Sequence, residues 1–405
     1  MKIKRPLRVC HISTLTGWGG VERMLIDLLT SESSNNIHHM LLTPSSKPEL
    51  LVQINEANIS HYEPKRRWRY DPLPIWHMAR WLRQSQVDVV HAYNAYANVW
   101  GYLAALFAHI PLFISGEHGT LLGISNTPMS LFDRWAQTHA TAVVANSQAS
   151  ATILHRKYHI PPEKIHVVAN AVAPLPQVDI KKVREQFGIP LSACLVGSVG
   201  RLAGPKNFIT FLEAANYICQ QRRDVYFMLI GGGPQERLLR DYIQAKQIAD
   251  RFILTGERSD ARCLIQAFDL FVSTSLQESF GNVLVEAALA AVPVVAPAVG
   301  GITDVIINQQ TGVLLEPTQP MVDDDTADAK IPYKEVLIGD QLLPPRALDA
   351  KQLADIILKL LASPEDRHQL GEAAYQRAIH LFTIDRYRQD LERIYMQLTM
   401  MVAKE

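Results

Sequence analysis

Short apolar runs alternate with longer stretches of helical spacing along the whole chain. The apolar runs are rich in Val, Ile, Leu and Phe, as is typical of buried strands; they comprise residues 7–14, 38–43, 87–92, 112–115, 142–145, 193–199, 225–230, 252–254, 270–273, 292–296 and 312–315. Strands that are separated by helices form parallel sheets with helices on both faces. The expected fold class is therefore α/β.

The runs fall into two series, separated by the Pro-rich and charge-poor segment 171–178. This predicts two doubly wound domains, an N-terminal one over 1–170 and a C-terminal one over 171–383, with a hinge between them. Ligands bind at the carboxyl ends of strands in such sheets, so a site is expected in the cleft between the domains. The last helical segment, 384–405, is expected to pack back on the first domain, and 321–345 to be an inserted, solvated loop.

Composition supports a folded protein of about two domains. The 405 residues are 48% hydrophobic and 20% charged, which excludes a disordered chain and a single small binding module. The net charge is zero, but residues 1–170 hold 16 Lys and Arg against 11 Asp and Glu, and residues 171–405 hold 24 against 29. Twelve of the 14 His and all six Trp lie in the first part, so the two halves are expected to meet different partners.

Cysteine usage and the N-terminus both indicate a cytoplasmic protein. Four Cys occur in apolar contexts without CxxC spacing, which favours reduced thiols over disulfides or a metal site. The basic N-terminus is followed by a short strand-like run and not by a signal-peptide core. The uncharged stretch 93–116 is long enough for a membrane span, but Pro111 inside it favours a buried helix followed by a buried strand.

The segment 269–304 carries the most informative chemistry. A strand ends near Ser275, a loop presents Glu278, and a helix begins at about Gly281 with Glu286 one turn inside it. Unpaired amides and the macrodipole make a helix start an anion site, here for a diphosphate on the amides of Asn282, Val283 and Leu284. A ribose can then bind Glu286, and Glu278 reaches the group beyond the phosphates. The alternative is that both Glu are solvated carboxylates that complement the helix dipole.

Glu278 and Glu286 are separated by seven residues within the run ESFGNVLVE. Further motifs follow one another along nearly the whole chain: 17–20 (GWGG), 117–119 (EHG), 145–147 (ANS), 168–172 (VANAV), 200–206 (GRLAGPK) and 231–234 (GGGP). Together they resemble the retaining glycosyltransferases of family 4. The resemblance implies the GT-B fold, in which two Rossmann-like doubly wound parallel-sheet domains face each other across a cleft.

The resemblance assigns roles that physical chemistry makes reasonable. Negative charge builds on the nucleoside diphosphate as its bond to the sugar breaks. Arg201 and Lys206, which follow a predicted strand, can stabilise that charge. The alternative is an ordinary pair of surface cations. Gly19 and Gly20 let the backbone approach the pyrophosphate, although such turns often serve tight geometry alone. His118 is implied to contact the donor sugar, although a lone His is more often structural. The expected catalytic residues are thus Glu278, His118, Arg201 and Lys206.

The first domain also carries clustered cations among aromatic residues, followed by a helical segment, 72–84, with two Trp. Such a pattern suits an anionic membrane surface or a phosphorylated lipid carrier. The alternative is a solvated basic loop with its Trp in the core. Nucleic acid is not expected as a partner, because the overall charge is neutral. The residues expected to serve the acceptor or the membrane are Lys65, Arg66, Arg67, Trp68 and Arg69.

The resemblance implies an enzyme that moves a sugar, with retention, from a UDP-sugar to a lipid-linked or surface-glycan acceptor. Bacterial lipopolysaccharide, capsule or O-antigen synthesis is the expected setting, at the inner face of the cytoplasmic membrane. No cofactor or metal is expected: Asp323-Asp324-Asp325 fits the DxD pattern for Mg²⁺, but it lies in the polar insertion. The alternatives are a nucleotide-sugar epimerase of the same architecture and a non-catalytic nucleotide-sugar-binding protein.

Overall fold

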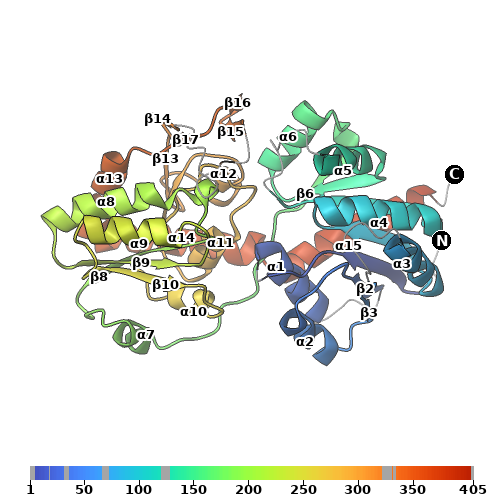
Figure 1. Ribbon diagram of the computed structural model, residues 1–405, viewed down its shortest axis with the longest axis horizontal. Helices are drawn as coiled ribbons and strands as arrows, with labels where there is room; N and C mark the ends of the chain where they lie inside the picture. The colour runs from blue at the N-terminus through green and yellow to red at the C-terminus, as the bar shows by residue number, and fades with distance from the viewer. Residues whose placement is uncertain are drawn as a thin grey trace. The chain divides into compact units, whose positions relative to one another are not determined.

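The computed structural model describes residues 5–17, 19–31, 36–65, 73–119, 128–321, 331 and 334–402. Chain contacts divide the protein into two compact units: unit 1 comprises Met1–Ala173 with Ile384–Glu405, and unit 2 comprises Pro174–Thr383 (Figure 1). The boundary between the two units thus falls after residue 173, three residues beyond the predicted domain boundary at 170. None of the described helices is long and apolar enough to cross a lipid bilayer.

Unit 1 is built on a seven-stranded parallel sheet with the spatial order β3-β2-β1-β4-β5-β6-β7. The apolar runs predicted five of these strands to within two residues at each end. They missed β3, which has only two residues, and β7, an edge strand with no buried residue. The strands are β1 (Leu7–Ile12), β2 (Ile37–Leu42), β3 (His61–Tyr62), β4 (Val89–Ala92), β5 (Leu112–Glu117), β6 (Ala142–Ala145) and β7 (Ile165–Val167).

The last helix of the chain completes the core of unit 1. Its buried residues recur every three or four positions, as an amphipathic helix requires, and they pack against the apolar side chains of β1, β4 and α1. Figure 1 shows this helix returning to the sheet of unit 1. The helices of the unit are α1 (Gly20–Thr30), α2 (Pro48–Glu56), α3 (Leu73–Gln84), α4 (Ala95–Ala108), α5 (Pro128–His139), α6 (Gln148–Tyr158) and α15 (Ile384–Val402), with a 3-10 turn at Pro162–Lys164.

Unit 2 is built on a six-stranded parallel sheet with the order β10-β9-β8-β11-β12-β13. The apolar runs predicted all six strands to within two residues. These are β8 (Cys194–Val199), β9 (Val225–Ile230), β10 (Phe252–Gly256), β11 (Leu270–Val272), β12 (Val294–Pro297) and β13 (Val313–Leu315). The helices are α7 (Ile180–Gln186), α8 (Phe208–Gln221), α9 (Glu236–Ala245), α10 (Ala261–Ile265), α11 (Asn282–Leu289), α12 (Ile302–Val305), α13 (Ala350–Ala362) and α14 (Pro364–Leu381), with a 3-10 turn at Gly204–Lys206.

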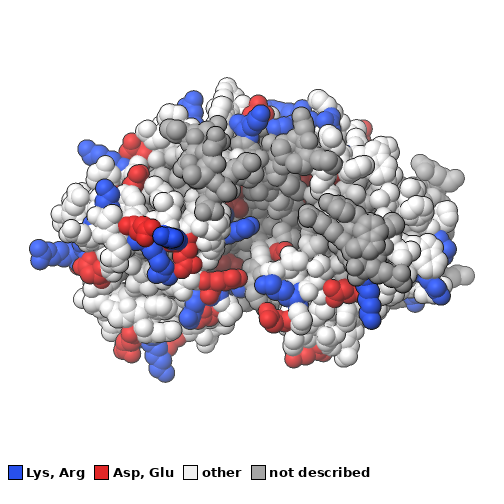
Figure 2. All heavy atoms as spheres, viewed as in Figure 1, with Lys and Arg blue, Asp and Glu red and all other residues white. Residues whose placement is uncertain are grey.

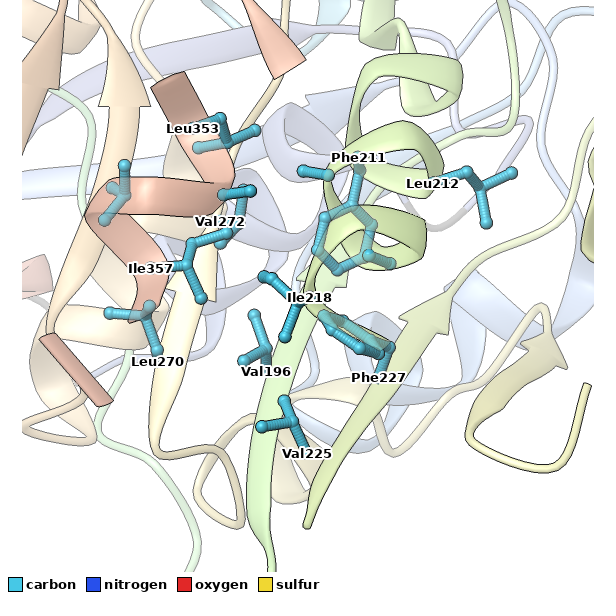
Figure 3. Close-up of a cluster of buried hydrophobic side chains, with 14 of the residues drawn as sticks. Val196, Phe211, Leu212, Ile218, Val225, Phe227, Leu270, Val272, Leu353 and Ile357 are labelled. Carbon is cyan, nitrogen blue, oxygen red and sulfur yellow. The ribbon is translucent and has the colours of Figure 1, made fainter. Parts of the chain in front are cut away.

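The core of unit 2 lies between the sheet and helices α8 and α13 (Figure 3). Phe211 of α8 meets Phe227 of β9 edge to face, with ring centroids 6.0 Å apart, and Phe252 stacks on Phe227 at 5.8 Å. Leu353 and Ile357 of α13 belong to the same buried cluster. This core fixes the position of β8, whose carboxyl end leads into the candidate site.

The insertion was expected to be a solvated loop, and its described part corrects that expectation. β15 (Val336–Ile338) and β16 (Gln341–Leu343) form an antiparallel hairpin, and β14 (Gln319–Pro320) pairs with β17 (Arg346–Ala347). Val336 is fully buried in a small cluster with Leu276 and Ala347, so apolar contacts hold the hairpin against unit 2. The acidic residues Asp323, Asp324, Asp325 and Asp328 lie outside the described residues.

Both sheets reverse their strand order once, at a position that we call the switch point. In unit 1 the chain starts at β1, builds outward to β3 and then restarts on the other side at β4; in unit 2 the equivalent neighbours are β8 and β11. Loops after neighbouring strands of this kind diverge and leave a crevice at the carboxyl edge, where open α/β sheets bind ligands. The predicted site residues Arg201, Lys206 and Glu278 lie in the loops that follow β8 and β11.

Candidate active site

The loop after β8 brings one exposed cation and one partly buried cation to the switch point of unit 2. Arg201 lies two residues after the strand, is exposed, and forms no ion pair with the described residues. Lys206 ends the 3-10 turn, and its side chain is 23% exposed. Asn207, which follows it, has a φ of 48°, a left-handed conformation that Asn adopts more readily than most residues.

The loop after β11 meets Lys206 with a carboxylate. Glu278, whose side chain is 16% exposed, forms an ion pair with the Lys206 ammonium. The hydroxyl of Thr274 donates to the carbonyl of Lys206 at 2.9 Å, and the amide of Leu276 donates to that of Pro205 at 2.9 Å. The two loops are therefore held together by backbone contacts as well as by charge, and the predicted clamp residue and signature carboxylate lie side by side.

Helix α11 begins directly after this loop. Gly281 precedes it with a φ of 98°, which only Gly adopts without strain, and it provides no side-chain cap. The structure corrects one member of the predicted anion site: the Leu284 amide donates to the Gly281 carbonyl at 2.9 Å, because the first turn closes tightly. Asn282 and Val283 are half-buried and remain candidates for contact with a diphosphate.

Glycines shape the same edge through close backbone contacts. A Cβ on Gly300 would lie 2.4 Å from the carbonyl oxygen of Glu278, and one on Gly301 would lie 2.0 Å from that of Ser279. The Gly301 amide donates to the Glu278 carbonyl at 2.8 Å. These two glycines therefore support the loop that carries Glu278. A Cβ on Gly231 would likewise lie 1.9 Å from the Gly200 carbonyl oxygen, so the glycine-rich turn packs against the loop of Arg201.

The second carboxylate of the signature is buried and paired. Glu286 is 7% exposed, and its Oε1 accepts a hydrogen bond at 3.0 Å from Nε of Arg262 on α10. It is therefore not the solvated carboxylate of the alternative interpretation. Arg262 was not predicted as a site residue, because it lies in no motif; the only signal for it is that a buried carboxylate requires a partner of opposite charge.

In unit 1, the glycine turn after β1 leads into α1. Gly19 caps this helix with an extended backbone, and the Glu22 side chain lies back over the turn, since a Cβ on Gly19 would lie 2.2 Å from Oε2 of Glu22. Burial raises the pKa of Glu22 above its ordinary value. Gly20 begins the helix itself. Glu22 was not predicted as a functional residue, although a Glu three residues after a helix cap is a capping pattern.

His118 follows β5 and is held from two sides. Its ring stacks on Tyr93 with centroids 5.2 Å apart, and Nδ1 lies 3.1 Å from Oδ1 of Asn170. Because an amide oxygen only accepts hydrogen bonds, the proton resides on Nδ1 and Nε2 is an acceptor. Burial lowers the pKa of His118 to about 4, so it is neutral near pH 7. Such a ring can accept a hydrogen bond from a sugar hydroxyl but supplies no cation to a phosphate.

The residue before His118 belongs to a buried pair of carboxyl groups. Glu117 accepts the Gly119 amide at 3.2 Å and Gln137 Nε2 at 3.0 Å, while Asp133 accepts Asn98 Nδ2 at 2.8 Å. Burial, and then the neighbouring Asp133, raise the pKa of Glu117 to about 8, and burial raises that of Asp133 to about 6. Glu117 and Asp133 therefore keep their protons at pH values at which exposed carboxyl groups have lost them.

A chain of neutral rings runs beneath the same edge of unit 1. His11 Nε2 lies 2.8 Å from His39 Nδ1, and His11 Nδ1 lies 2.9 Å from the Tyr93 hydroxyl. His91 Nδ1 lies 2.7 Å from the hydroxyl of Tyr395 on α15. Burial lowers the pKa of each of these three His, to about 4 for His39. The last helix thus closes a polar network inside the apolar core.

Comparison with known families decides the assignment. Residues 18–174 match the family described as Glycosyltransferase Family 4, and residues 179–324 match the one described as Glycosyl transferases group 1. This chain belongs to the family 4 glycosyltransferases. The two matched ranges fall one on each unit, and the units are the two Rossmann-like halves of a GT-B fold.

Relatives and solved structures agree with this family. A 2-deoxystreptamine glucosyltransferase of Streptomyces kanamyceticus is 28% identical over 203 residues, 48% of this chain and 52% of the relative. The UDP-Gal:alpha-D-GlcNAc-diphosphoundecaprenol alpha-1,3-galactosyltransferase of Escherichia coli is 26% identical over 247 residues, 58% of this chain and 64% of the relative. The match thus spans between about half and two thirds of these enzymes. Anabaena HepE, solved in complex with UDP-glucose, shares the fold with a TM-score of 0.77 at 20% identity, over 98% of this chain and 100% of its own.

Within this chain the predicted site residues fall into three groups. Unit 2 brings Lys206, Glu278 and the start of α11 together, with Arg201 in the same loop as Lys206. Unit 1 holds Gly19, Gly20 and His118 at the carboxyl edge of its own sheet. Lys65 is exposed, and the rest of the predicted basic loop, Arg66, Arg67, Trp68 and Arg69, lies outside the described residues.

Proposed function

We propose that this chain is a retaining glycosyltransferase that transfers a sugar from a UDP-sugar to a lipid-linked or surface-glycan acceptor in bacterial polysaccharide synthesis. The observation that carries the proposal is the convergence of Arg201, Lys206 and Glu278 with the start of α11 at the switch point of unit 2. Cations beside a helix start suit a diphosphate, and a carboxylate beside them suits the sugar attached to it. The UDP-glucose bound by HepE and the UDP-sugar in the name of the Escherichia coli relative support the choice of nucleotide.

The proposed reaction replaces one bond at the anomeric carbon by another. The bond to the β-phosphate oxygen breaks, and its electron pair stays on the departing diphosphate. The acceptor hydroxyl oxygen bonds to the anomeric carbon on the same face, and its proton passes to that diphosphate. Arg201 and Lys206 stabilise the negative charge as it grows. Lys206 is neutralised by Glu278 before a donor binds, so the diphosphate competes with the Glu278 carboxylate for this cation.

Two further roles follow from the geometry. Glu286, oriented by Arg262, is proposed to bind the ribose of the donor, and the neutral His118 to accept a hydrogen bond from a hydroxyl of the donor sugar. Glu278 acts on the reacting sugar, either as a nucleophile or by orienting a front-face reaction. The positive charge of Arg201 and Lys206 supports transfer without a divalent metal. Turnover that is lost in EDTA and restored by Mg²⁺ would overturn the last point.

A panel of nucleotide-sugars tests the donor directly. Each UDP-, GDP- and ADP-sugar is added at increasing concentration, and the shift in the midpoint of thermal unfolding is measured; a ligand at a hundred times its Kd stabilises by about 2.7 kcal/mol. We expect a UDP-sugar to give the largest shift. Equal shifts from all three nucleotides would contradict a UDP-specific donor site.

Product analysis separates the proposed reaction from its alternatives. A transferase releases UDP only when an acceptor is present, and NMR of the product shows the anomeric configuration of the donor. An epimerase converts the UDP-sugar without an acceptor, and a binding protein leaves it unchanged. Inversion at the anomeric carbon would refute retention while leaving transfer intact.

The lipid-linked acceptor is supported by the basic segment that begins at Lys65. Replacing Lys65, Arg66, Arg67 and Arg69 by Ser is expected to weaken both binding to anionic vesicles and transfer to a lipid-linked acceptor. A variant that binds vesicles and transfers sugar like the unaltered protein would remove this segment from the proposal.

A further inference from the structure

Three neighbouring helices of unit 1 present large apolar side chains to solvent. Helices α3, α4 and α5 lie side by side over the sheet, with α4 in contact with both of the others (Figure 1). The most exposed of these side chains are each more than half exposed: Trp76 on α3, Leu106 and Phe107 on α4, and Leu131 and Phe132 on α5. The uncharged stretch 93–116 was expected to form a buried helix followed by a buried strand. The last turn of its helix, α4, corrects that expectation, because Leu106 and Phe107 are exposed.

Contacts between neighbouring helices bring the turns that carry these side chains together. Trp135 of α5 meets Tyr102 of α4 edge to face at 5.0 Å, and Leu106 lies one turn beyond Tyr102. Arg83 of α3 donates to the carbonyl of Phe107 at 2.6 Å. Arg80 lies 5.7 Å above the ring of Trp76, one turn away on the same side of α3. We call this surface the α3–α5 face.

The charge on the α3–α5 face has one sign. Arg80 and Arg83 are exposed on α3, and α4 contains no charged residue. Arg134 of α5 is half-buried, with its guanidinium over the ring of Tyr158. Asp133 is the only carboxylate in the three helices, and it is 1% exposed. Unit 2 is different, because acidic and basic side chains intermingle over the side of it seen in Figure 2.

We propose that the α3–α5 face docks on an anionic lipid surface. Aromatic and aliphatic side chains enter the headgroup region, and arginines at the same level meet the lipid phosphates. The single sign of charge favours this occupant over a second copy of the chain, since a self-complementary contact would bring the arginines of two copies together. The inference extends the proposed function, because a lipid-linked acceptor is presented at such a surface.

Vesicle sedimentation tests the docking face. The full chain is mixed with vesicles of phosphatidylcholine alone and with vesicles containing phosphatidylglycerol, at low and high salt. We expect binding to the anionic vesicles only, weakened by salt. The triple variant Trp76→Ser, Phe107→Ser, Phe132→Ser is expected to bind at least tenfold more weakly, and Arg80→Gln with Arg83→Gln to lose most of the salt dependence.

Leu238, an apolar residue of α9 that is 48% exposed, provides the matched control: Leu238→Ser is expected to bind vesicles like the unaltered protein. Unaltered protein that stays in the supernatant, or a triple variant that binds equally well, overturns the proposal. So does a dimer in solution that the triple variant converts to a monomer. The thermal shift with UDP reports folding and the donor site separately, so a failure of docking leaves the donor assignment standing, and the reverse.

Discussion

The two units share a sheet topology but place charge differently at the same edge. In unit 2 the candidate site consists of ion pairs, Lys206 with Glu278 and Arg262 with Glu286, beside the exposed Arg201. In unit 1 the equivalent edge is lined by buried groups that stay neutral, with His118 and Glu117 foremost. The fold therefore fixes where a ligand approaches, while the side chains decide whether it meets charge or neutral hydrogen-bonding groups.

The largest expected effect is on kcat, from a change at the charged carboxyl edge of the sheet of unit 2. Arg201→Ala removes the exposed cation, and we expect kcat to fall by about 10²–10³-fold with little change in stability. Arg237→Ala is the matched control, because Arg237 is an exposed arginine of the same unit and its side chain is 94% exposed. Steady-state release of UDP is the measurement. Full turnover in Arg201→Ala would show that the exposed cation of unit 2 does not take part in the reaction.

The second prediction tests whether Glu286 and Arg262 act as a pair. Glu286→Ala is expected to weaken UDP-sugar binding about tenfold and to reduce stability by about 1–3 kcal/mol, since it leaves Arg262 without its carboxylate. Arg262→Gln is expected to weaken donor binding too, because Glu286 loses its orientation. Binding titrations on both single variants and the double variant give the coupling. Strictly additive losses would show that the ion pair does not orient Glu286.

The third prediction concerns acid. His11, His39, His91 and His118 are held neutral in the folded state, with pKa values lowered from 6.5, to about 4 for His39 and His118. The unfolded chain binds protons at these residues below pH 6.5, so their contribution to stability is full above 6.5 and declines as pH falls toward 4. Hydrogen exchange resolved by unit should show unit 1 losing protection first. Equal loss in both units would contradict this.

A smaller effect of opposite sign is expected from Glu117. Its pKa is raised to about 8, so the folded state keeps a proton that the unfolded chain releases above about pH 4.5. Stability from this group is present below pH 4.5 and declines as pH rises toward 8. Glu117→Gln should flatten that decline in denaturant titrations at pH 5, 6.5 and 8. An unchanged slope would show that Glu117 ionises normally.

The smallest effect is expected from one hydroxyl. Tyr395→Phe leaves the ring in place but removes the partner of His91 Nδ1, for a loss of about 1 kcal/mol. Tyr375→Phe on α14 offers a control on the same class of substitution in unit 2. A loss as small as that of the control would mean that the network adds nothing to the packing of α15.

The sequence predicted the strands well because most of them are continuous apolar runs whose residues are largely buried. It missed β3 and β7 because two or three half-exposed residues carry no such pattern. It placed Lys206 and Glu278 on separate motifs, and topology brought them into contact: β8 and β11 lie 70 residues apart in sequence but are neighbours in the sheet.

Other features depend on side-chain and backbone geometry that no motif encodes. The pairing of Arg262 with Glu286 depends on how α10 lies against α11. The use of the Leu284 amide within the first turn of α11 depends on how tightly that turn closes. The apolar composition of α4 predicted burial, but only the packing of α3 and α5 shows which turn stays in solvent.

Helix α15 has a consequence for how the chain is made. It lies after the whole of unit 2 in sequence, yet it supplies six buried residues, including Tyr387 and Tyr395, to the interior of unit 1. During translation, the whole contiguous segment of unit 2 leaves the ribosome before α15 does. Until α15 follows, the apolar side chains of unit 1 that pack against it lack this partner. Unit 1 therefore cannot complete its core until the end of the chain has been synthesised, although most of its residues are synthesised first.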